Sequence, residues 1–209
     1  MFVLSLAQQL CPDKIPVQPG VRLGEGADGE VFSIIGDENK ALKLGIIYEQ
    51  PNRKVDRQYE QIQEVLDTIQ YEHPSAYVYL YEHGYLGTYS RQLRKHLQQQ
   101  YIIYYYIMDK LYPITEDEGK VFHSIISHED RNIKKNFSPE KIREMLQGMS
   151  TGLDFDAEKV KLFCSNIKEA PGSHLDIAVR NIMKNKANDF KLIDLDRISL
   201  EKTYVKTQS

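Results

Sequence analysis

The stretch His174-Leu-Asp176-Ile-Ala-Val-Arg-Asn181 is followed a short way along the chain by Phe190-Lys-Leu-Ile-Asp194-Leu-Asp196. Polar turn residues separate the two apolar runs, a pattern that predicts a β-hairpin. This hairpin brackets two carboxylates, Asp176 and Asp194, and the amide of Asn181. Such a set can supply a general base and the hard oxygen ligands that Mg²⁺ takes beside substrate phosphates. Taken singly, Asn181 and Asp194 are compatible with plain turn positions, but their joint spacing favours a site.

Helices are predicted upstream of this stretch. Thr115-x-x-Glu118 is a capping box that opens the first of them. Ser138-Pro139-Glu140 opens the second, with proline in its first turn. The predicted helices cover 116–127, 139–149 and 156–168. The pattern changes from strands to helices near residues 110–114, so a boundary is expected there.

Strands dominate the chain before that boundary, because β-branched and aromatic residues gather in short runs between turn residues. After Pro51, apolar residues recur at helical spacing, which predicts one amphipathic helix. The polar run 91–100 is expected to connect the last two strands. The predicted elements are a first strand or packed arm at 1–7, a hairpin at 21–35, a strand at 40–44, a helix from 55 to 69, and strands at 77–81 and 101–108.

The turn of the predicted hairpin is rich in glycine: Gly24-Glu-Gly26-Ala-Asp-Gly29-Glu-Val31 follows a G-x-G-x-x-G-x-V pattern. Glycines at these positions let the backbone approach phosphate oxygens and donate N–H groups to them. A hairpin turn without a ligand would account for the glycines equally well. A βαβ dinucleotide site is excluded, because a strand rather than a helix follows the glycines.

A lysine and a glutamate further along extend this pattern. Lys43 ends the run Ala41-Leu-Lys43 on the next strand, where its ammonium can point toward a phosphate under the glycines. Glu60 on the predicted helix can pair with Lys43, and Glu64, four residues on, competes for that role. Solvent-exposed positions remain the alternative for all three side chains.

The composition limits the classes of protein to consider. The chain has 209 residues, a net charge of -3, 41% hydrophobic and 27% charged residues, which is typical of a soluble globular protein of one domain or two small lobes. No overall positive charge favours nucleic acid or anionic lipid. Two cysteines far apart predict neither a disulfide framework nor a zinc site. We therefore expect a cytoplasmic protein without a membrane or nucleic-acid partner.

Together these elements resemble, in their order, the eukaryotic-type protein kinase superfamily: glycine-rich loop, A-x-K lysine, helix glutamate, H-x-D-x-x-x-x-N loop and metal-binding aspartate. The resemblance spans residues 21–197. It implies an α+β, two-lobed, protein-kinase-like fold in a single domain over 1–209. The expected N-lobe, about 1–110, holds a five-stranded antiparallel sheet and one helix. A hinge at about 108–113 leads to a reduced helical C-lobe at about 114–209.

The resemblance also implies roles for individual residues. Asp176 would orient or accept the proton of the attacking hydroxyl, and Arg180 would stabilise the transferred phosphoryl charge. Asn181 and Asp194 would hold Mg²⁺. The residues implied in ATP binding are Leu23, Gly24, Gly26, Gly29, Val31, Ala41, Lys43 (paired with Glu60), Met108, Asp109, Leu111 and Met183.

The chain departs from the family in several places. Leu175 replaces the arginine that often contacts a phosphorylated activation loop, and Asp196 stands where the family has glycine. Asp196 is compatible with a second metal, an ion pair or a solvent-facing position. Few residues follow Asp194, so the sequence predicts a truncated kinase without a full activation segment, braced by the helices at 116–127 and 139–149. Truncated relatives of this kind occur among bacterial effector and phage-encoded kinases, and some need an activating protein partner.

The expected activity is ATP- and Mg²⁺-dependent phosphorylation of a protein hydroxyl on serine, threonine or tyrosine. The Asp-Ile-Ala-Val-Arg-Asn run is similar to the loop of many tyrosine kinases, which favours tyrosine weakly. The alternatives are a small-molecule kinase of aminoglycoside or metabolite type with the same fold, and a nucleotide-binding pseudokinase.

Overall fold

A computed structural model describes residues 3–26, 28–48, 55–94, 97–127, 139–149, 152–174, 177–195 and 198–200. The described residues form two compact units. The first lies within Met1–His73 and Tyr79–Leu111, and the second within Pro74–Val78 and Tyr112–Ser209.

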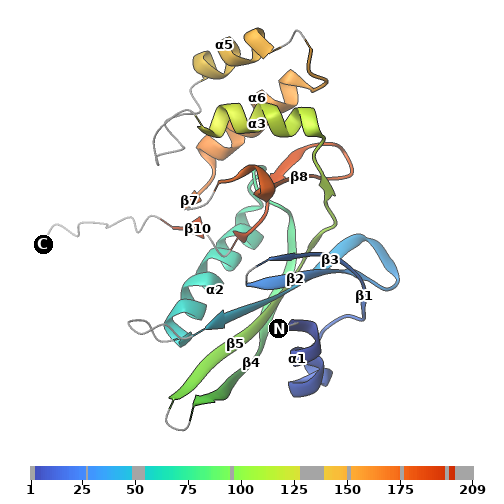
Figure 1. The fold of residues 1–209 in the computed structure, drawn as a ribbon, viewed down its shortest axis with the longest axis vertical. Helices are drawn as coiled ribbons and strands as arrows, with labels where there is room; N and C mark the ends of the chain where they lie inside the picture. The colour runs from blue at the N-terminus through green and yellow to red at the C-terminus, as the bar shows by residue number, and fades with distance from the viewer. Residues whose placement is uncertain are drawn as a thin grey trace, which may run out of the picture. The chain divides into compact units, whose positions relative to one another are not determined.

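The first unit is built on a five-stranded antiparallel sheet with the strand order β1-β2-β3-β5-β4 (Figure 1). The sheet and its strand direction confirm the predicted α+β class. Helix α2 lies between β3 and β4 in the sequence and packs on this sheet. The strands are β1 (Pro19–Gly26), β2 (Gly29–Ile34), β3 (Asp37–Tyr48), β4 (Leu80–Arg94) and β5 (Leu97–Asp109), and the helix is α2 (Val55–Glu72).

The last two strands differ from the prediction. The expected strand at 77–81 begins only at Leu80, because the backbone of Tyr77 forms a parallel bridge with Leu192 of the second unit instead. The expected connection at 91–100 is largely strand: Ser90 pairs with Gln100 and Arg91 with Gln99. Cross-strand pairing extends the hairpin through polar residues that carry little strand propensity of their own.

The N-terminal segment is a helix, α1 (Val3–Leu10), so of the two predicted forms the strand is wrong and the packed arm takes helical form. Its buried residues Val3 and Ala7 join the apolar cluster on one face of the sheet. The carboxylate of Glu30 on β2 accepts a hydrogen bond of 3.0 Å from the backbone N–H of Leu4, in the first turn of this helix. A carboxylate there satisfies an orphan N–H and complements the helix dipole. The contact joins residues far apart in sequence, so a local pattern does not reveal it.

The opposite face of the sheet contains one position that only glycine fits. Gly45 on β3 lies directly opposite Tyr104 on β5, whose side chain is 1% exposed. A Cβ added to Gly45 would collide with ring atoms and the hydroxyl oxygen of Tyr104. The outer end of the Tyr104 ring therefore occupies the space that a Cβ would take.

We expect Gly45→Ala to lower the free energy of unfolding by about 2 kcal/mol, because the methyl group forces a buried ring to move. Urea denaturation measures the change. Gly148→Ala is the matched control: nothing lies within 4 Å of a Cβ there, in helix α5 (Pro139–Met149), and alanine is the better helix former. Equal effects of the two substitutions would contradict the explanation.

The second unit contains the three predicted helices, which the structure confirms as α3 (Glu116–Ser127), α5 (Pro139–Met149) and α6 (Ala157–Glu169). Its short strands are β6 (Tyr112–Pro113), β7 (Ser173–His174), β8 (Ile182–Lys184), β9 (Phe190–Leu192) and β10 (Ile198–Ser199). The predicted hairpin is the antiparallel pair β8-β9, with β6 on the other side of β8.

The predicted capping box at the start of α3 is present. The backbone N–H of Thr115 donates to the Glu118 carboxylate over 2.7 Å, and the N–H of Glu118 donates to Thr115 Oγ1 over 3.2 Å. The same carboxylate lies 3.0 Å from the ammonium of Lys184 on β8, and both side chains are largely buried. One glutamate thus caps the helix and ties it to the hairpin.

Glu118→Ala is expected to destabilise the protein by about 2 to 3 kcal/mol, since it removes the cap and leaves the Lys184 ammonium without its carboxylate. The comparison is Glu116→Ala in the same turn, where the exposed carboxylate pairs with Lys120. That change is expected to cost no more than about 1 kcal/mol. Denaturation midpoints that shift equally for both variants would show that the buried pair adds nothing.

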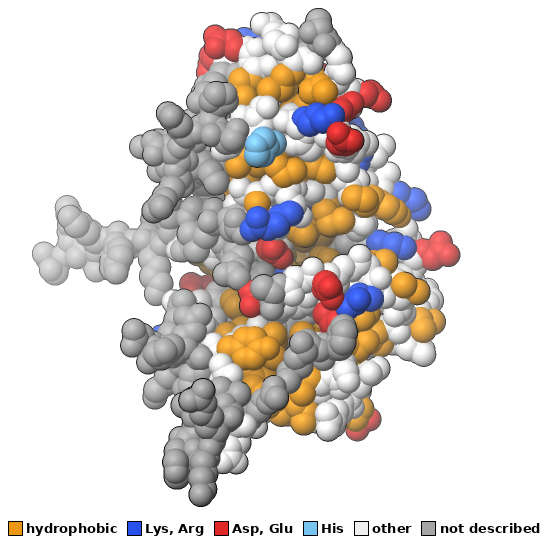
Figure 2. Space-filling model, viewed as in Figure 1, with side chains coloured by type: hydrophobic (Ala, Val, Ile, Leu, Met, Phe, Trp, Pro, Cys, Tyr) orange, Lys and Arg blue, Asp and Glu red, His pale blue; other side chains and the backbone are white. Residues whose placement is uncertain are grey.

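Charges of both signs lie next to one another on the face of the molecule shown in Figure 2. In the parts of the chain that the structure describes, no helix combines the length and the apolar character that a membrane crossing requires.

Candidate nucleotide and metal site

One face of the first unit's sheet gathers most of the residues expected to bind ATP. Val31 pairs with Lys43, and Lys43 pairs with Tyr106. Residues directly opposite one another point to the same face, as do residues two positions apart in a strand. The pairings Gly24 with Val31, Gly26 with Gly29, and Ala41 with Met108 therefore belong to this face. The expected residues that share it are Gly24, Gly26, Gly29, Val31, Ala41, Lys43 and Met108.

Lys43 is held within this face rather than at a solvated edge. Only 8% of the residue is exposed, and its ammonium lies 5.3 Å from the centre of the Tyr106 ring. A ring face attracts a cation at this distance. Burying an ammonium is costly, and such lysines are usually retained to meet an anion or a carboxylate. Sequence reasoning missed Tyr106, although alternation along 101–108 places it on the face of Met108.

The three glycines of the loop differ in what surrounds them. A Cβ on Gly29 would lie 2.6 Å from the backbone oxygen of Leu44, so the packing of β2 against β3 explains this glycine without a ligand. At Gly24 and Gly26 nothing lies within 4 Å of an added Cβ. These two positions leave space in which the backbone can approach a ligand.

The glutamates predicted to pair with Lys43 are both exposed. Glu60 and Glu64 lie outside the buried stripe of α2, whose members are Val55, Gln58, Val65, Leu66 and Ile69. Glu60 lines a surface hollow with Tyr59 and Tyr85. The ion pair between Lys43 and Glu60 stays a prediction. Gln58, whose amide donates to the backbone oxygen of Tyr48 over 3.3 Å, is the buried polar residue of this helix that sequence reasoning missed.

The expected hinge residues lie at the C-terminal end of β5 and just beyond it. The N–H of Asp109 donates to the backbone oxygen of Tyr79 over 3.0 Å, and the N–H of Lys110 donates to that of Asn39 over 2.8 Å. These two donors are engaged within the first unit. An adenine edge would thus be recognised through the carbonyl of Asp109 and the N–H of Leu111.

Two expected adenine contacts, Leu23 and Met183, are not among the paired residues of this sheet face. Leu23 is 45% exposed, next to a register shift between Arg22 and Gly24 that interrupts the alternation of the strand. Met183 is half-buried on β8 of the second unit, opposite Lys191.

In the second unit, the hairpin brings Asn181 and Asp194 to the same end. Ile182 pairs with Leu192 in the hairpin. The pairing extends by one more hydrogen bond, of 2.9 Å, from the N–H of Ile193 to the backbone oxygen of Asn181. Asp194 is the next residue, so the amide and the carboxylate flank this last pair. Asn181 is 2% exposed, an unusual environment for an amide in a plain turn.

The backbone at Asp194 has φ 58°, in the left-handed region that residues other than glycine seldom adopt. The following residue, Leu195, is fully buried. The buried side chain of Leu195 on one side and the hydrogen-bonded Ile193 on the other hold Asp194 in this conformation. Backbone strain of about 1 to 3 kcal/mol at such positions is characteristic of functional sites.

Three of the remaining residues singled out in the sequence, Leu175, Asp176 and Asp196, lie outside the described residues. Ile177, which follows Asp176, is buried, and Arg180 is exposed on a short 3-10 turn, η2 (Val179–Asn181).

The amide of Asn181 and the carboxylate of Asp194 are donors of the kind that magnesium takes in proteins. Among the described residues, no group of three or more His, Cys, Asp or Glu side chains forms a metal cluster. One amide and one carboxylate at a hairpin end are hard oxygen donors, and Mg²⁺ is usually bound through one or two carboxylates plus substrate phosphates. Asn181 and Asp194 are the described residues that would hold it.

The strand order β1-β2-β3-β5-β4 with α2 between β3 and β4, followed by a helical unit with the β8-β9 hairpin, is a protein-kinase-like fold. Of the residues quoted from the sequence, Lys43 lies on β3, Glu60 on α2, and Asn181 and Asp194 beside the β8-β9 hairpin.

Three solved structures, two of which are named as kinases, provide the structural comparison. The kinase domain of ROP18, in complex with AMP-PNP and sucrose, is 16% identical with a TM-score of 0.48, over 88% of this chain and 52% of that one. A MAP kinase from Leishmania major is 14% identical with a TM-score of 0.41, over 96% and 51%. WbdD is 12% identical with a TM-score of 0.41, over 90% and 34%. This chain thus spans about a third to a half of the matched structures. No family model and no curated protein matches the sequence.

Proposed function

We propose that the protein is an ATP- and Mg²⁺-dependent phosphotransferase that phosphorylates a hydroxyl group of a protein. The observation that carries the proposal is the strand register, which groups the loop glycines, Val31, Ala41, Lys43 and Met108 on one face of a kinase-like sheet. These residue types suit a nucleotide: small positions for the phosphates, a cation for their charge and apolar side chains for the base.

The roles follow from the chemistry of each group. Backbone N–H groups near Gly24 and Gly26 and the ammonium of Lys43 would stabilise the phosphates. Asn181 and Asp194 would hold Mg²⁺, which when bound neutralises phosphate charge. Asp176 would orient the acceptor hydroxyl and take its proton as the terminal phosphoryl group leaves ADP. Phosphoryl transfer depends mainly on positioning and charge neutralisation, and these residues supply both.

The test is transfer of label from γ-labelled ATP with Mg²⁺ to proteins of a cell lysate, for the wild type beside Asp176→Asn. The wild type is expected to label proteins and the variant to be at background. Equal labelling by both would overturn the proposal. Because Asn has nearly the same shape as Asp, a thermal melt of the two proteins verifies that the variant is folded.

The small-molecule alternative is tested in the same assay. ADP release that depends on an added aminoglycoside or metabolite, without labelled protein, would assign the activity to a small acceptor. A nucleotide-binding pseudokinase would bind ATP and release no ADP with any acceptor or partner. The protein acceptor is favoured because the loop from Asp176 to Asn181 is similar to that of many tyrosine kinases.

A further inference from the structure

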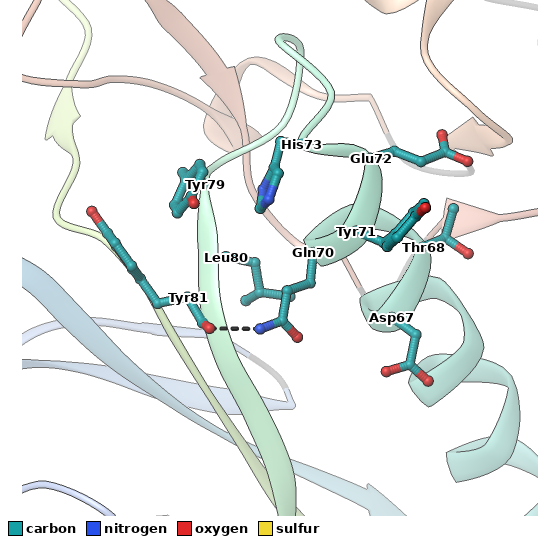
Figure 3. A pocket seen from close by; sticks show the side chains of 9 residues that line it. All are labelled: Asp67, Thr68, Gln70, Tyr71, Glu72, His73, Tyr79, Leu80 and Tyr81. Atoms are coloured by element: carbon teal, nitrogen blue, oxygen red, sulfur yellow. Dashed lines mark hydrogen bonds between the residues drawn. The ribbon is translucent and has the colours of Figure 1, made fainter.

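A groove lies between the C-terminal half of α2 and the start of β4, wholly within the first unit (Figure 3). Its volume is about 840 Å³, enough for several side chains. Helix residues form one wall and strand residues the other, and a hydrogen bond of 2.6 Å from the Gln70 amide to the backbone oxygen of Tyr81 joins them. The proposed phosphotransfer uses none of the residues that line it.

The helix wall is strongly negative. Helix α2 carries five carboxylates and one arginine, a net charge of -4, whereas the whole chain carries -3. Asp67 and Glu72 of this helix line the groove. The last turn of α2 contains no basic residue. The negative end of the helix dipole therefore adds to the carboxylates without a cation from the helix itself to offset it.

The rest of the lining is aromatic and exposed. The ring of His73, just after α2, stacks on that of Tyr79, just before β4, with their centres 4.6 Å apart and an interplanar angle of 8°. Tyr79 in turn meets Tyr81 edge-on at 4.8 Å. On the helix side, Tyr71 is 88% exposed. Exposed ring faces attract cationic groups, and Asp67 and Glu72 add negative charge to the lining of the same groove.

One ring of this wall already binds a cation. The ammonium of Lys40 lies 4.5 Å from the centre of the Tyr81 ring. Burial and the neighbouring Asp109 carboxylate raise the pKa of Tyr81 to about 12, so its ring stays a neutral phenol at physiological pH. Tyr81 thus adds a ring face to the groove without adding a charge of its own.

A second, smaller hollow of about 380 Å³ lies along the same seam of α2 and β4. It is lined by Asp56, Tyr59 and Tyr85 among others, again a carboxylate with tyrosines. His83, which lines this hollow, is 2.9 Å from the Asp67 carboxylate that lines the larger groove. The two hollows therefore form an acidic, aromatic strip long enough for more than one side chain.

We infer that this strip, the two hollows along α2 and β4, docks an arginine-bearing segment of a partner protein. Arginine fits better than lysine because its planar guanidinium stacks on rings and meets carboxylates with two parallel N–H groups. The carboxylates repel nucleic acid and phosphorylated peptides. Docking here needs no nucleotide, and the larger groove shares no residue with the proposed phosphotransfer. The smaller hollow is also lined by Glu60, the predicted partner of Lys43.

The test uses the full chain and a fluorescent, end-blocked peptide of alternating glycine and arginine, with binding followed by anisotropy in the absence of nucleotide. The matched peptide carries citrulline, a neutral isostere, at each arginine. We expect the citrulline peptide to bind more than about tenfold more weakly. Spermine at the same concentration of positive charge is expected not to displace the arginine peptide.

Two variants and one control locate the site. Glu72→Gln and Tyr79→Leu are each expected to weaken binding of the arginine peptide by about five- to tenfold. Glu64→Gln removes the same charge from the same helix outside both hollows and is expected to change binding less than twofold. The inference is overturned if the citrulline peptide binds equally well, if spermine competes, or if the control weakens binding as much as Glu72→Gln.

Discussion

Lys43→Met is expected to lower the rate of phosphoryl transfer from ATP by at least about a hundredfold, the scale on which one preorganised charge contributes to such a transition state. The ammonium is buried against the Tyr106 ring, on the sheet face that carries the loop glycines. Methionine has a similar length and an apolar stem, so it fills the same space over the ring and retains the fold. The loss therefore reports the missing charge.

The measurement is label transfer under conditions where the wild type is linear in time. Lys40→Met is the control. Lys40 lies on the same strand three residues away, so it belongs to the opposite face of the sheet, and its ammonium contacts the Asp37 carboxylate over 3.3 Å. The control is expected to retain at least about half of the activity, in line with the small contribution of exposed ion pairs. Comparable losses in the two variants would mean that the position of Lys43 in the sheet is irrelevant to the reaction.

Asp194→Asn is expected to be the second severe change, with a loss of about a hundredfold or more in activity at saturating Mg²⁺. The substitution keeps the size of the side chain and replaces a charged oxygen donor by an amide, a weaker ligand for a hard cation. Asparagine also tolerates the left-handed backbone at this position, where φ is 58°. Local structure is thus preserved while the metal ligand is weakened.

Calorimetry of ATP binding with and without Mg²⁺ tests whether the loss of activity comes from weaker metal binding. For the wild type we expect Mg²⁺ to strengthen binding, and for Asp194→Asn this increment is expected to be largely lost. Asp189→Asn tests the other end of the same hairpin, where Asp189 contacts Lys159 over 3.4 Å. If the Mg²⁺-dependent gain in ATP binding survives in Asp194→Asn and is lost in Asp189→Asn, the metal binds at the Asp189 end of the hairpin and the prediction is wrong.

Local signals in the sequence were sufficient for the second unit. The capping box at Thr115 and Glu118, the proline at 139 and the helical periodicity each act within one or two turns, and all three helices form where expected. The β8-β9 hairpin also follows from neighbouring residues. Elements whose stabilising contacts are local are those that a single sequence predicts well.

Tertiary contacts decided the features that the sequence did not reveal. Helix α1 depends on the Glu30 carboxylate. The start of β4 depends on the parallel bridge that Tyr77 forms with Leu192. In the site, strand alternation was enough to align Lys43 with the glycines, whereas the position of Glu60 depends on the rotation of α2 about its axis. Helix rotation is set by packing against the whole sheet, as the burial of Gln58 illustrates.

The short segment Pro74–Val78 has a consequence for dividing this protein into fragments. The backbone N–H of Val78 donates to Leu192, and the N–H of Leu192 donates to Ala76, so this stretch from the first half of the sequence is a partner of β9. A cut between Leu111 and Tyr112 would leave β9 without that neighbour and leave 76–78 with unmatched backbone groups. Separately expressed halves are therefore expected to be insoluble alone, and to regain structure when they are produced together.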